Sequence, residues 1–326
     1  MTRPAPRVLV TRAIPAAGID LLRSVCDVEV WPEPLAPPRA ELLRLVAGRA
    51  GLLVLPTERI DDEVMEAAGT DLCVVSSFSV GYDHLDVTAA ARRGIQLGHT
   101  PGVLSETTAD TTWALLMAAA RRISEAERYV RADRWGGGRI DDLLGVDVSG
   151  ATLGIIGMGR IGQAVARRAR GFDMTVVYHQ RHRLPEALEN ELRARWAPLD
   201  ELLGVADFVS LHAPHSAHTH RIIDGAALAL MKSSAILVNT ARGSLVDSDA
   251  LLDALDRGII RGAALDDTDP EPLPPDHPLA QRDDCLVVPH IGSATVATRE
   301  RIAVMAAENV LAGLRGEPLP HPVPAT

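Results

Sequence analysis

The stretch ATLGIIGMGRIGQAVARRA, residues 151–169, decides the fold of this chain. A short apolar run leads into the pattern GMGRIG at 157–162, and a segment rich in Ala and Arg with helical character follows. A G-x-G-x-x-G pattern between a strand and a helix is typical of a dinucleotide-binding turn. Gly157 permits the tight turn, Gly159 lets backbone approach a pyrophosphate, and Gly162 lets the helix pack closely on the strand. The pyrophosphate is then expected at the N-terminus of the helix, where N–H groups and the helix dipole favour an anion.

The next strand, expected at 174–178, ends without the acidic residue that normally accepts a hydrogen bond from the ribose 2'-hydroxyl. The chain continues instead with His-Gln-Arg-His-Arg at 179–183. Arg181 and Arg183 could pair with a 2'-phosphate through charge-assisted hydrogen bonds, so the pattern favours NADP(H), with NAD(H) possible. The alternative is an ordinary solvated basic loop, because exposed arginines are common.

Length and composition exclude several classes of protein. At 326 residues the chain is long enough for two domains, and a net charge of −10 with a pI near 5.6 argues against nucleic-acid or anionic-membrane partners. The three cysteines lack the number and spacing of a disulfide framework or a zinc site. No apolar leader and no apolar run of membrane-spanning length is present, so we expect a cytoplasmic protein.

Short apolar runs alternate with helical patterns along the chain, which is typical of parallel βα units. Strands are expected before the glycine pattern at 7–11, 28–31, 51–56 and 72–81, and after it at 175–178, 207–212, 235–240, 262–267 and 285–290. The predicted fold class is therefore α/β, with two doubly wound parallel-sheet domains and a cleft between them. One long helix is expected from Ser105 to about Arg134, before Gly136-Gly137-Gly138, and its apolar part should pack on a domain or on a partner subunit.

Chemistry in such a fold is expected in loops at the carboxyl ends of the strands. Three of these loops carry Arg242, Glu271 and His290. Reduction of an oxoacid needs a cation for the carboxylate, a proton donor for the carbonyl oxygen and an acid that keeps the donor protonated. Arg, His and Glu fit these roles together, although any one of them alone would usually be a surface residue.

The segments SVGYDHLD, GMGRIG, NTARGSLVD, DPEPLPPDHPL and VPHIGSAT together resemble the D-isomer-specific 2-hydroxyacid dehydrogenases. The last two segments, with AENVLAGLRGEPLP, resemble the glyoxylate/hydroxypyruvate reductase branch. The resemblance covers essentially the whole chain. It implies a flavodoxin-like substrate-binding domain formed by residues 1–98 and 292–326, and a Rossmann dinucleotide-binding domain at 99–291. It also implies a homodimer and no catalytic metal.

The resemblance assigns roles to individual positions. His290 would be the acid/base, Glu271 its partner and Arg242 the oxoacid ligand. Further substrate contacts would come from Val80, Gly81 and Ser293. The cofactor contacts would be Gly157, Gly159, Arg160, Ile161, Gly162, Gln180, Arg181, Arg183, Ala213, Pro214, Thr240, Asp266, which meets the nicotinamide carboxamide, and Gly292.

Two departures limit what the resemblance implies. In the reductase branch a second tryptophan follows the one that resembles Trp135, whereas here Gly136-Gly137-Gly138 follow, which puts substrate selectivity in question. The loop LHAPHSAHTHRI contains four histidines, at 212, 215, 218 and 220, that suggest a metal cluster. The family pattern makes this segment a loop beside the cofactor, and no Cys or carboxylate ligand stands nearby in the sequence, so no metal is predicted.

The sequence thus predicts an NAD(P)-dependent enzyme that reduces glyoxylate, hydroxypyruvate or a similar small 2-oxoacid to the D-2-hydroxyacid. A reductase of bulkier 2-oxoacids is the first alternative. A dinucleotide-sensing interaction protein of the same fold is the second, because an intact set of catalytic residues does not exclude it.

Overall fold

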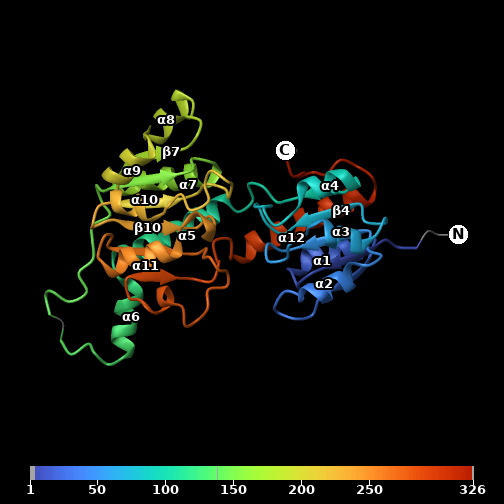
Figure 1. Ribbon diagram of the computed structural model, residues 1–326, viewed down its shortest axis with the longest axis horizontal. Coiled ribbons are helices and arrows are strands. Elements are labelled where there is room, and N and C mark those ends of the chain that lie inside the picture. The colour runs from blue at the N-terminus through green and yellow to red at the C-terminus, as the bar shows by residue number, and fades with distance from the viewer. Residues whose placement is uncertain (1–3, 138, 325–326) are drawn as a thin grey trace. The chain divides into compact units, whose positions relative to one another are not determined.

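A computed structural model describes residues 4–137 and 139–324. The chain divides into two compact units, which we call unit 1 (Met1–Leu104 with Ala294–Thr326) and unit 2 (Ser105–Ser293). Each unit contains one parallel sheet with helices on both of its faces (Figure 1). Gly138, one of the three glycines expected after the long helix, lies outside the described residues.

Unit 1 is built on a five-stranded sheet in the order β2-β1-β3-β4-β5. All of its strand pairs are parallel, so each connection must cross over the sheet, and the strand order is that of flavodoxin-like folds. The strands are β1 Arg7–Val10, β2 Asp27–Val30, β3 Gly51–Val54, β4 Val74–Ser77 and β5 Gln96–Gly98.

Two groups of helices cover the two faces of this sheet. One face packs on α2 (Arg39–Val46), α3 (Asp62–Ala68) and α4 (Val87–Arg93), and the other on α1 (Ala16–Arg23) and α12 (Val296–Leu314). The last helix of the chain therefore belongs to the unit that begins the chain. Asn309 of α12 fixes this return, because its buried amide donates to Ser76 Oγ (3.3 Å) and to the His99 carbonyl (3.0 Å).

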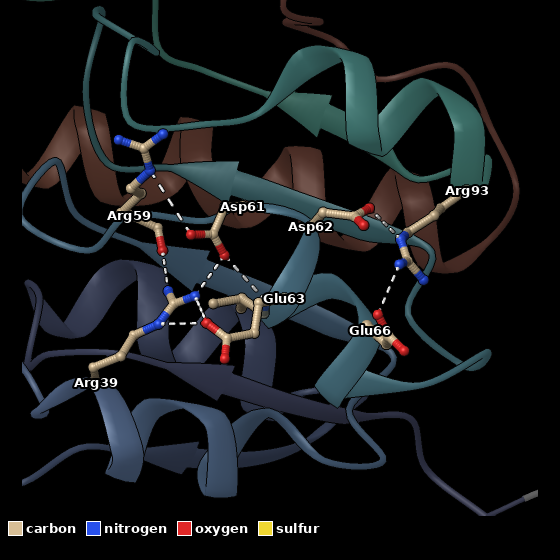
Figure 2. Close-up of polar contacts among 8 residues, drawn as sticks. Arg39, Arg59, Asp61, Asp62, Glu63, Glu66 and Arg93 are labelled. Carbon is tan, nitrogen blue, oxygen red and sulfur yellow. Dashed lines mark hydrogen bonds and ion pairs between the residues drawn. The ribbon is translucent and has the colours of Figure 1, made fainter.

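Ion pairs join the exposed sides of α2, α3 and α4 (Figure 2). Arg39 pairs with Asp61 at 2.6 Å and also with Glu63. Arg93 pairs with Asp62 at 2.8 Å and with Glu66 at 3.4 Å. Pairs this exposed contribute little to stability, because solvent screens the charges and holding the long side chains costs entropy. The buried apolar layer beneath them therefore holds the helices in place.

Unit 2 is built on a seven-stranded parallel sheet in the order β12-β11-β10-β9-β6-β7-β8. Its strands are β6 Thr152–Ile156, β7 Thr175–His179, β8 Ala194–Trp196, β9 Phe208–Leu211, β10 Ile236–Asn239, β11 Gly262–Leu265 and β12 Cys285–Val287. The chain winds outward from β6 in both directions, as in dinucleotide-binding folds, so β6 and β9 flank the topological switch point. Ligands of such sheets bind beyond the carboxyl ends of the strands at this point.

Helices also cover both faces of the second sheet (Figure 1). α9 (Leu199–Val205), α10 (Gly225–Leu230) and α11 (Ser248–Asp256) pack on one face. α5 (Ser105–Ala120), α7 (Arg160–Ala169) and α8 (Glu186–Leu192) pack on the other. Trp113, Leu115 and Leu116 of α5 are buried in this second layer, so the apolar part of the expected long helix packs on its own unit.

The single helix expected from Ser105 to about Arg134 is wrong. The chain forms two helices, α5 and α6 (Ile123–Arg131), with Arg122 in the left-handed region between them at φ 53°. The helix stops because the Ala120 carbonyl accepts a hydrogen bond from the Val146 N–H group (2.9 Å). Gly145 allows this approach, since a Cβ at that position would lie 2.3 Å from the same carbonyl oxygen.

The predicted fold class is confirmed, since both units are parallel α/β sheets. The expected strands agree with the observed ones to within a few residues, but β5 and β8 were missed. Each of these is a three-residue edge strand, too short to show an apolar pattern. Within residues 4–137 and 139–324, the helices are too short or too polar to cross a membrane.

Candidate active site

The glycine turn joins β6 to α7 at the switch point of unit 2. Gly157 has φ 96°, and a Cβ there would lie 2.5 Å from the Ala213 nitrogen, at the end of β9. A Cβ on Gly162 would lie 2.2 Å from the Gly157 carbonyl oxygen. Around Gly159, by contrast, the described residues other than its two chain neighbours place no heavy atom within 4 Å of the corresponding position. The fold itself therefore requires the first and third glycines, whereas the second faces open space.

The N-terminus of α7 is suited to an anion. Gly159 is the N-cap residue and supplies no side-chain acceptor for the first N–H groups of the helix. Gln180 holds the turn in place by accepting a hydrogen bond from the Met158 N–H group (3.0 Å). Arg160 is exposed and Ile161 half-buried at the start of the helix. The residues present thus fit a dinucleotide, with open space at Gly159 and helix N–H groups beside it.

The two arginines after β7 have different surroundings. Arg183 forms a two-point ion pair with Glu189 (2.6 and 2.8 Å), and Glu189 also accepts a hydrogen bond from the Tyr178 hydroxyl (2.6 Å). The Arg183 guanidinium and this hydroxyl lower the pKa of Glu189 to about 2, so the carboxylate stays ionised and keeps its hold on Arg183. Arg181 is exposed, and its Nε lies 3.1 Å from His182 Nε2.

The end of β10 carries Arg242. Asn239, the last residue of that strand, is fully buried and donates to the carbonyl oxygens of Arg242 (2.8 Å) and Asp267 (3.3 Å). Gly243 lets the loops after β10 and β11 touch, because a Cβ there would lie 2.0 Å from the Thr268 carbonyl. The sequence analysis missed Asn239, although a polar residue that closes an apolar strand was the available signal.

Glu271 and His290 lie together in the loops after β11 and β12. His290 Nδ1 is 2.6 Å from Glu271 Oε1. This hydrogen bond, opposed by burial and aided by nearby carboxylates, raises the pKa of His290 to about 9. The imidazole is therefore mostly protonated at neutral pH, with Nδ1–H directed to Glu271.

The backbone at His290 is held in an unusual conformation. His290 has φ 51°, a region that side chains other than glycine rarely adopt. Asp266, at the end of β11, stabilises this turn because its carboxylate accepts from the N–H groups of Ile291 (2.6 Å) and Gly292 (2.7 Å). Burial raises the pKa of Asp266, and these two hydrogen bonds act against that rise. Asp266 thus orients the His290 loop.

Asp267 was not predicted as a site residue, yet it lies among the predicted ones. It is 2% exposed, and its Oδ1 is 3.5 Å from His290 Nδ1 and 4.0 Å from Arg242 Nη1. Burial raises the pKa of this carboxyl group to about 7. The signal available in the sequence was a pair of acids, Asp266 and Asp267, directly after an apolar strand.

Other predicted contacts in unit 2 lie near the carboxyl edge of its sheet. Thr240 is buried, and its hydroxyl hydrogen-bonds that of Thr112 in α5 (2.8 Å). Ala213 is buried, Pro214 is exposed, and Ser293 is half-buried after Gly292.

In unit 1, the carbonyl groups of Val80 and Gly81 accept hydrogen bonds from His99 Nδ1–H (2.8 Å) and Ser79 Oγ (2.5 Å). These bonds fix the peptide planes of the loop that follows β4.

The four histidines at 212–220 do not form one cluster. His212 is half-buried, with one ring nitrogen 2.8 Å from Ser210 Oγ, and the burial of its ring lowers its pKa to about 3. His215 and His220 contact each other edge to face, with ring centroids 5.9 Å apart. In the described part of the chain, the ligand-type atoms that do gather within 4.8 Å of one another belong to Asp267, Glu271 and His290.

Comparison with known proteins agrees with this geometry. Residues 113–292 match the family model described as D-isomer specific 2-hydroxyacid dehydrogenase, NAD binding domain. The chain belongs to this family. It is 47% identical over 317 residues to a glyoxylate reductase of Korarchaeum cryptofilum (strain OPF8), which covers 97% of this chain and 95% of that protein.

Solved structures show the same relationship. The TT0316 protein from Thermus thermophilus superposes with a TM-score of 0.91 at 51% identity, covering 98% of this chain and 100% of that one. An NADPH-dependent glyoxylate/hydroxypyruvate reductase from Sinorhizobium meliloti, in complex with NADP and malonate, has a TM-score of 0.86 at 31% identity and covers 98% and 97%. The predicted family and enzyme class are confirmed: this is an NAD(P)-dependent oxidoreductase that acts on 2-oxoacids.

The three glycine environments predict two different mutant phenotypes. Gly157→Ala should destabilise the protein, because the new Cβ meets the backbone of His212 and Ala213 just after β9 and the backbone at 157 has a positive φ. A fall in Tm of about 10 °C is expected. Gly159→Ala should keep the Tm of the parent, because its Cβ meets open space, and should lose most of its NAD(P)H binding, because the Cβ would occupy the space where the pyrophosphate approaches the turn. Differential scanning calorimetry and NADPH fluorescence titration measure the two effects, and equal Tm losses in both variants would contradict this account.

The Glu271 hydrogen bond predicts the titration of His290. Glu271→Gln removes the main cause of the raised pKa, so the pKa of His290, followed by NMR, should fall from about 9 by roughly one unit or more. Asp276→Asn, which changes an exposed carboxyl group in the same loop, serves as the control and should leave the titration unchanged. An unaltered His290 titration in Glu271→Gln would remove Glu271 from this role.

Proposed function

We propose that this enzyme reduces glyoxylate and hydroxypyruvate with NADPH, to glycolate and D-glycerate. The observation that carries the proposal is the 2.6 Å contact between Glu271 and His290, with Arg242 in the neighbouring loop. A cation for a carboxylate and an acid for a carbonyl oxygen are the two groups that a small 2-oxoacid requires. The printed names of the relatives, glyoxylate reductase and glyoxylate/hydroxypyruvate reductase, support the same substrates.

Reduction of the oxoacid requires a hydride at the carbonyl carbon and a proton at the carbonyl oxygen. When bound, the nicotinamide supplies a hydride to the carbonyl carbon of the oxoacid. His290 donates its Nε2 proton to the carbonyl oxygen, which receives the electron pair of the broken C=O π bond, and the imidazole becomes neutral. The Nδ1 proton stays on the ring and is donated in the hydrogen bond to Glu271, which keeps the ring in one orientation. In oxidation the same nitrogen accepts the hydroxyl proton.

Binding of the oxoacid carboxylate is assigned to Arg242, whose planar guanidinium matches a carboxylate at two points. The N–H groups of Val80 and Gly81 and the Ser293 side chain are proposed as further substrate contacts. Residues 1–98 with 292–326 would then form the substrate-binding domain and residues 99–291 the dinucleotide-binding domain. We also propose that Asp266 contacts the nicotinamide carboxamide. Its carboxylate accepts two backbone hydrogen bonds and has further lone pairs with which it can accept from the carboxamide N–H group.

The preference for NADPH is proposed from the loop after β7. No carboxylate follows the strand to accept from a 2'-hydroxyl, and Arg181 is exposed where a 2'-phosphate is expected. Arg183 is already paired with Glu189, so we expect Arg183 to contribute less than Arg181 to binding of the 2'-phosphate.

A homodimer is proposed from exposed apolar side chains on one part of unit 2. Ile123 and Val130 of α6 are 57% and 54% exposed, and Trp135, Ile140 and Leu144 of the following loop are 71%, 99% and 58% exposed. Several large apolar side chains exposed along one segment are typical of an interaction surface. α6 and this loop project from unit 2 (Figure 1). A cytoplasmic location stays a prediction from the sequence.

The substrate proposal predicts the result of a panel with variants. Glyoxylate and hydroxypyruvate should be reduced with kcat/KM at least about tenfold above phenylpyruvate and 2-oxoisocaproate. His290→Ala should lower kcat by about 10²-fold or more and leave NADPH binding nearly unchanged, and Arg242→Lys should chiefly raise KM. Faster reduction of the bulky oxoacids would replace the proposed substrates. No turnover of any oxoacid, with NADPH binding intact, would favour the sensor alternative.

The cofactor proposal predicts the ratio of kcat/KM with NADPH to kcat/KM with NADH. NADPH should exceed NADH by at least about tenfold in kcat/KM, because one charged phosphate contact contributes about 1.5–3 kcal/mol, and added salt should reduce the ratio. Arg181→Ser should remove most of the preference, and Arg183→Ser should remove less of it. Equal use of both cofactors by the parent, or an unchanged ratio in Arg181→Ser, would reject the proposal.

The dimer proposal predicts a concentration-independent dimer at micromolar concentration in sedimentation velocity. Replacing Val130 and Ile140 with Asp should give monomers, because both side chains would then be charged in an apolar interface. Val25→Asp, an exposed valine of unit 1, is the matched control and should remain dimeric. A monomeric parent protein would overturn the proposal.

A further inference from the structure

Asp267 carries a buried carboxyl oxygen that no hydrogen bond satisfies. Its Oδ1 is inaccessible to solvent and has no hydrogen-bond partner among the described residues. Buried polar atoms in native proteins are nearly always hydrogen-bonded, so an unsatisfied one needs an explanation. This oxygen also lies next to both His290, the proposed proton donor, and Arg242, the proposed ligand of the oxoacid carboxylate.

The surroundings of Asp267 contain charges of both signs. His290 and Arg242 favour its ionised form, at 3.5 Å and 4.0 Å, while Asp266 and Glu271 disfavour it. Burial is the largest effect and disfavours the charge, so the pKa of Asp267 rises to about 7. With His290 protonated and Asp267 ionised, the five side chains carry two positive and three negative charges. With Asp267 protonated, the same group is neutral.

An oxoacid brings one more negative charge to this group. We propose that binding of the oxoacid carboxylate at Arg242 is linked to protonation of Asp267, which makes Asp267 a positioning residue that controls oxoacid affinity. While Asp267 is ionised, its carboxylate competes with the substrate for the Arg242 guanidinium and repels the incoming anion. Once protonated, Asp267 leaves the attraction of Arg242 to the substrate, and its O–H group can satisfy a hydrogen bond. The inference rests on the proposed role of Arg242 in oxoacid binding.

The linkage has a definite direction. A group that is ionised in the free enzyme and neutral in the complex takes up a proton when the ligand binds, so affinity falls as pH rises through its pKa. For a pKa near 7, KM for glyoxylate should rise about tenfold between pH 6 and pH 8. His290, with its pKa near 9, stays mostly protonated over this range and does not produce the same change.

The first test measures proton uptake without turnover. Oxamate carries the carboxylate and carbonyl of a 2-oxoacid but resists reduction, so it can be titrated into the enzyme loaded with NADPH. Isothermal titration in PIPES and in Bis-Tris, which both buffer between pH 6 and pH 7 and differ in ionisation enthalpy, gives the number of protons taken up. The expected values are about 0.5 proton at pH 7 and about 0.1 at pH 6. Absence of uptake at pH 7, or no oxamate binding at pH 6, would overturn the proposal.

The second test uses two variants. Asp267→Asn keeps the size of the side chain and removes its titration, so oxamate binding should take up about 0.1 proton or less at pH 7, and KM should vary less than about threefold between pH 6 and 8. Asp269→Asn, an exposed neighbour in the same loop, is the control and should behave as the parent. A purely structural role would alter Tm or kcat without removing the proton uptake. Retention of uptake in Asp267→Asn would contradict the proposal.

The outcomes separate this inference from the proposed substrates. If glyoxylate and hydroxypyruvate are not reduced but oxamate binds with uptake of a proton through Asp267, the substrates are wrong and the linkage holds. If both are reduced and KM is independent of pH from 6 to 8, the substrates hold and the linkage is wrong.

Discussion

The register of three neighbouring strands positions the proposed catalytic side chains. Asn239 at the end of β10 pairs with Leu265 at the end of β11, and Leu265 pairs with Val287 at the end of β12. Because parallel strands in register finish at one edge, the loops that carry Arg242, Asp266 to Glu271 and His290 start at the same level. Side chains far apart in the sequence thereby become neighbours. A shift of one strand by a residue would move its loop and turn its side chains to the other face of the sheet.

Charge balance in a low-dielectric environment then determines what these side chains can do. Interactions between charges strengthen away from water, so a carboxylate beside an imidazole raises the pKa of the imidazole. Glu271 acts in this way on His290. Asp266 uses its carboxylate on backbone N–H groups instead, which shapes the turn that presents the imidazole. Asp266, Asp267 and Glu271 thus have three different environments, which the sequence alone does not distinguish.

Sequence reasoning reached the parts of this site that depend on local pattern. The glycine turn follows from a strand, a spacing and a helix, and Gly157 is indeed required by the approach of β9. The proximity of Glu271 and His290 followed from strand ends together with the family resemblance. Tertiary contacts decided what was missed. The partner of Arg183 is a glutamate on the next helix, the break at Arg122 depends on Val146, and the burial of Asp267 depends on three separate loops. No local pattern records those contacts.

The central claim is that one imidazole, kept protonated by Glu271, transfers the proton in both directions of the reaction. The most direct measurement is the pH dependence of kcat for the parent enzyme, in reduction of the oxoacid and in oxidation of the D-2-hydroxyacid. Reduction should decline above about pH 9, where His290 loses its proton, and oxidation should increase through the same range, because it needs the neutral ring. A midpoint near 6.5 in both directions, the ordinary value for an isolated imidazole, or rates that do not depend on pH, would contradict the account.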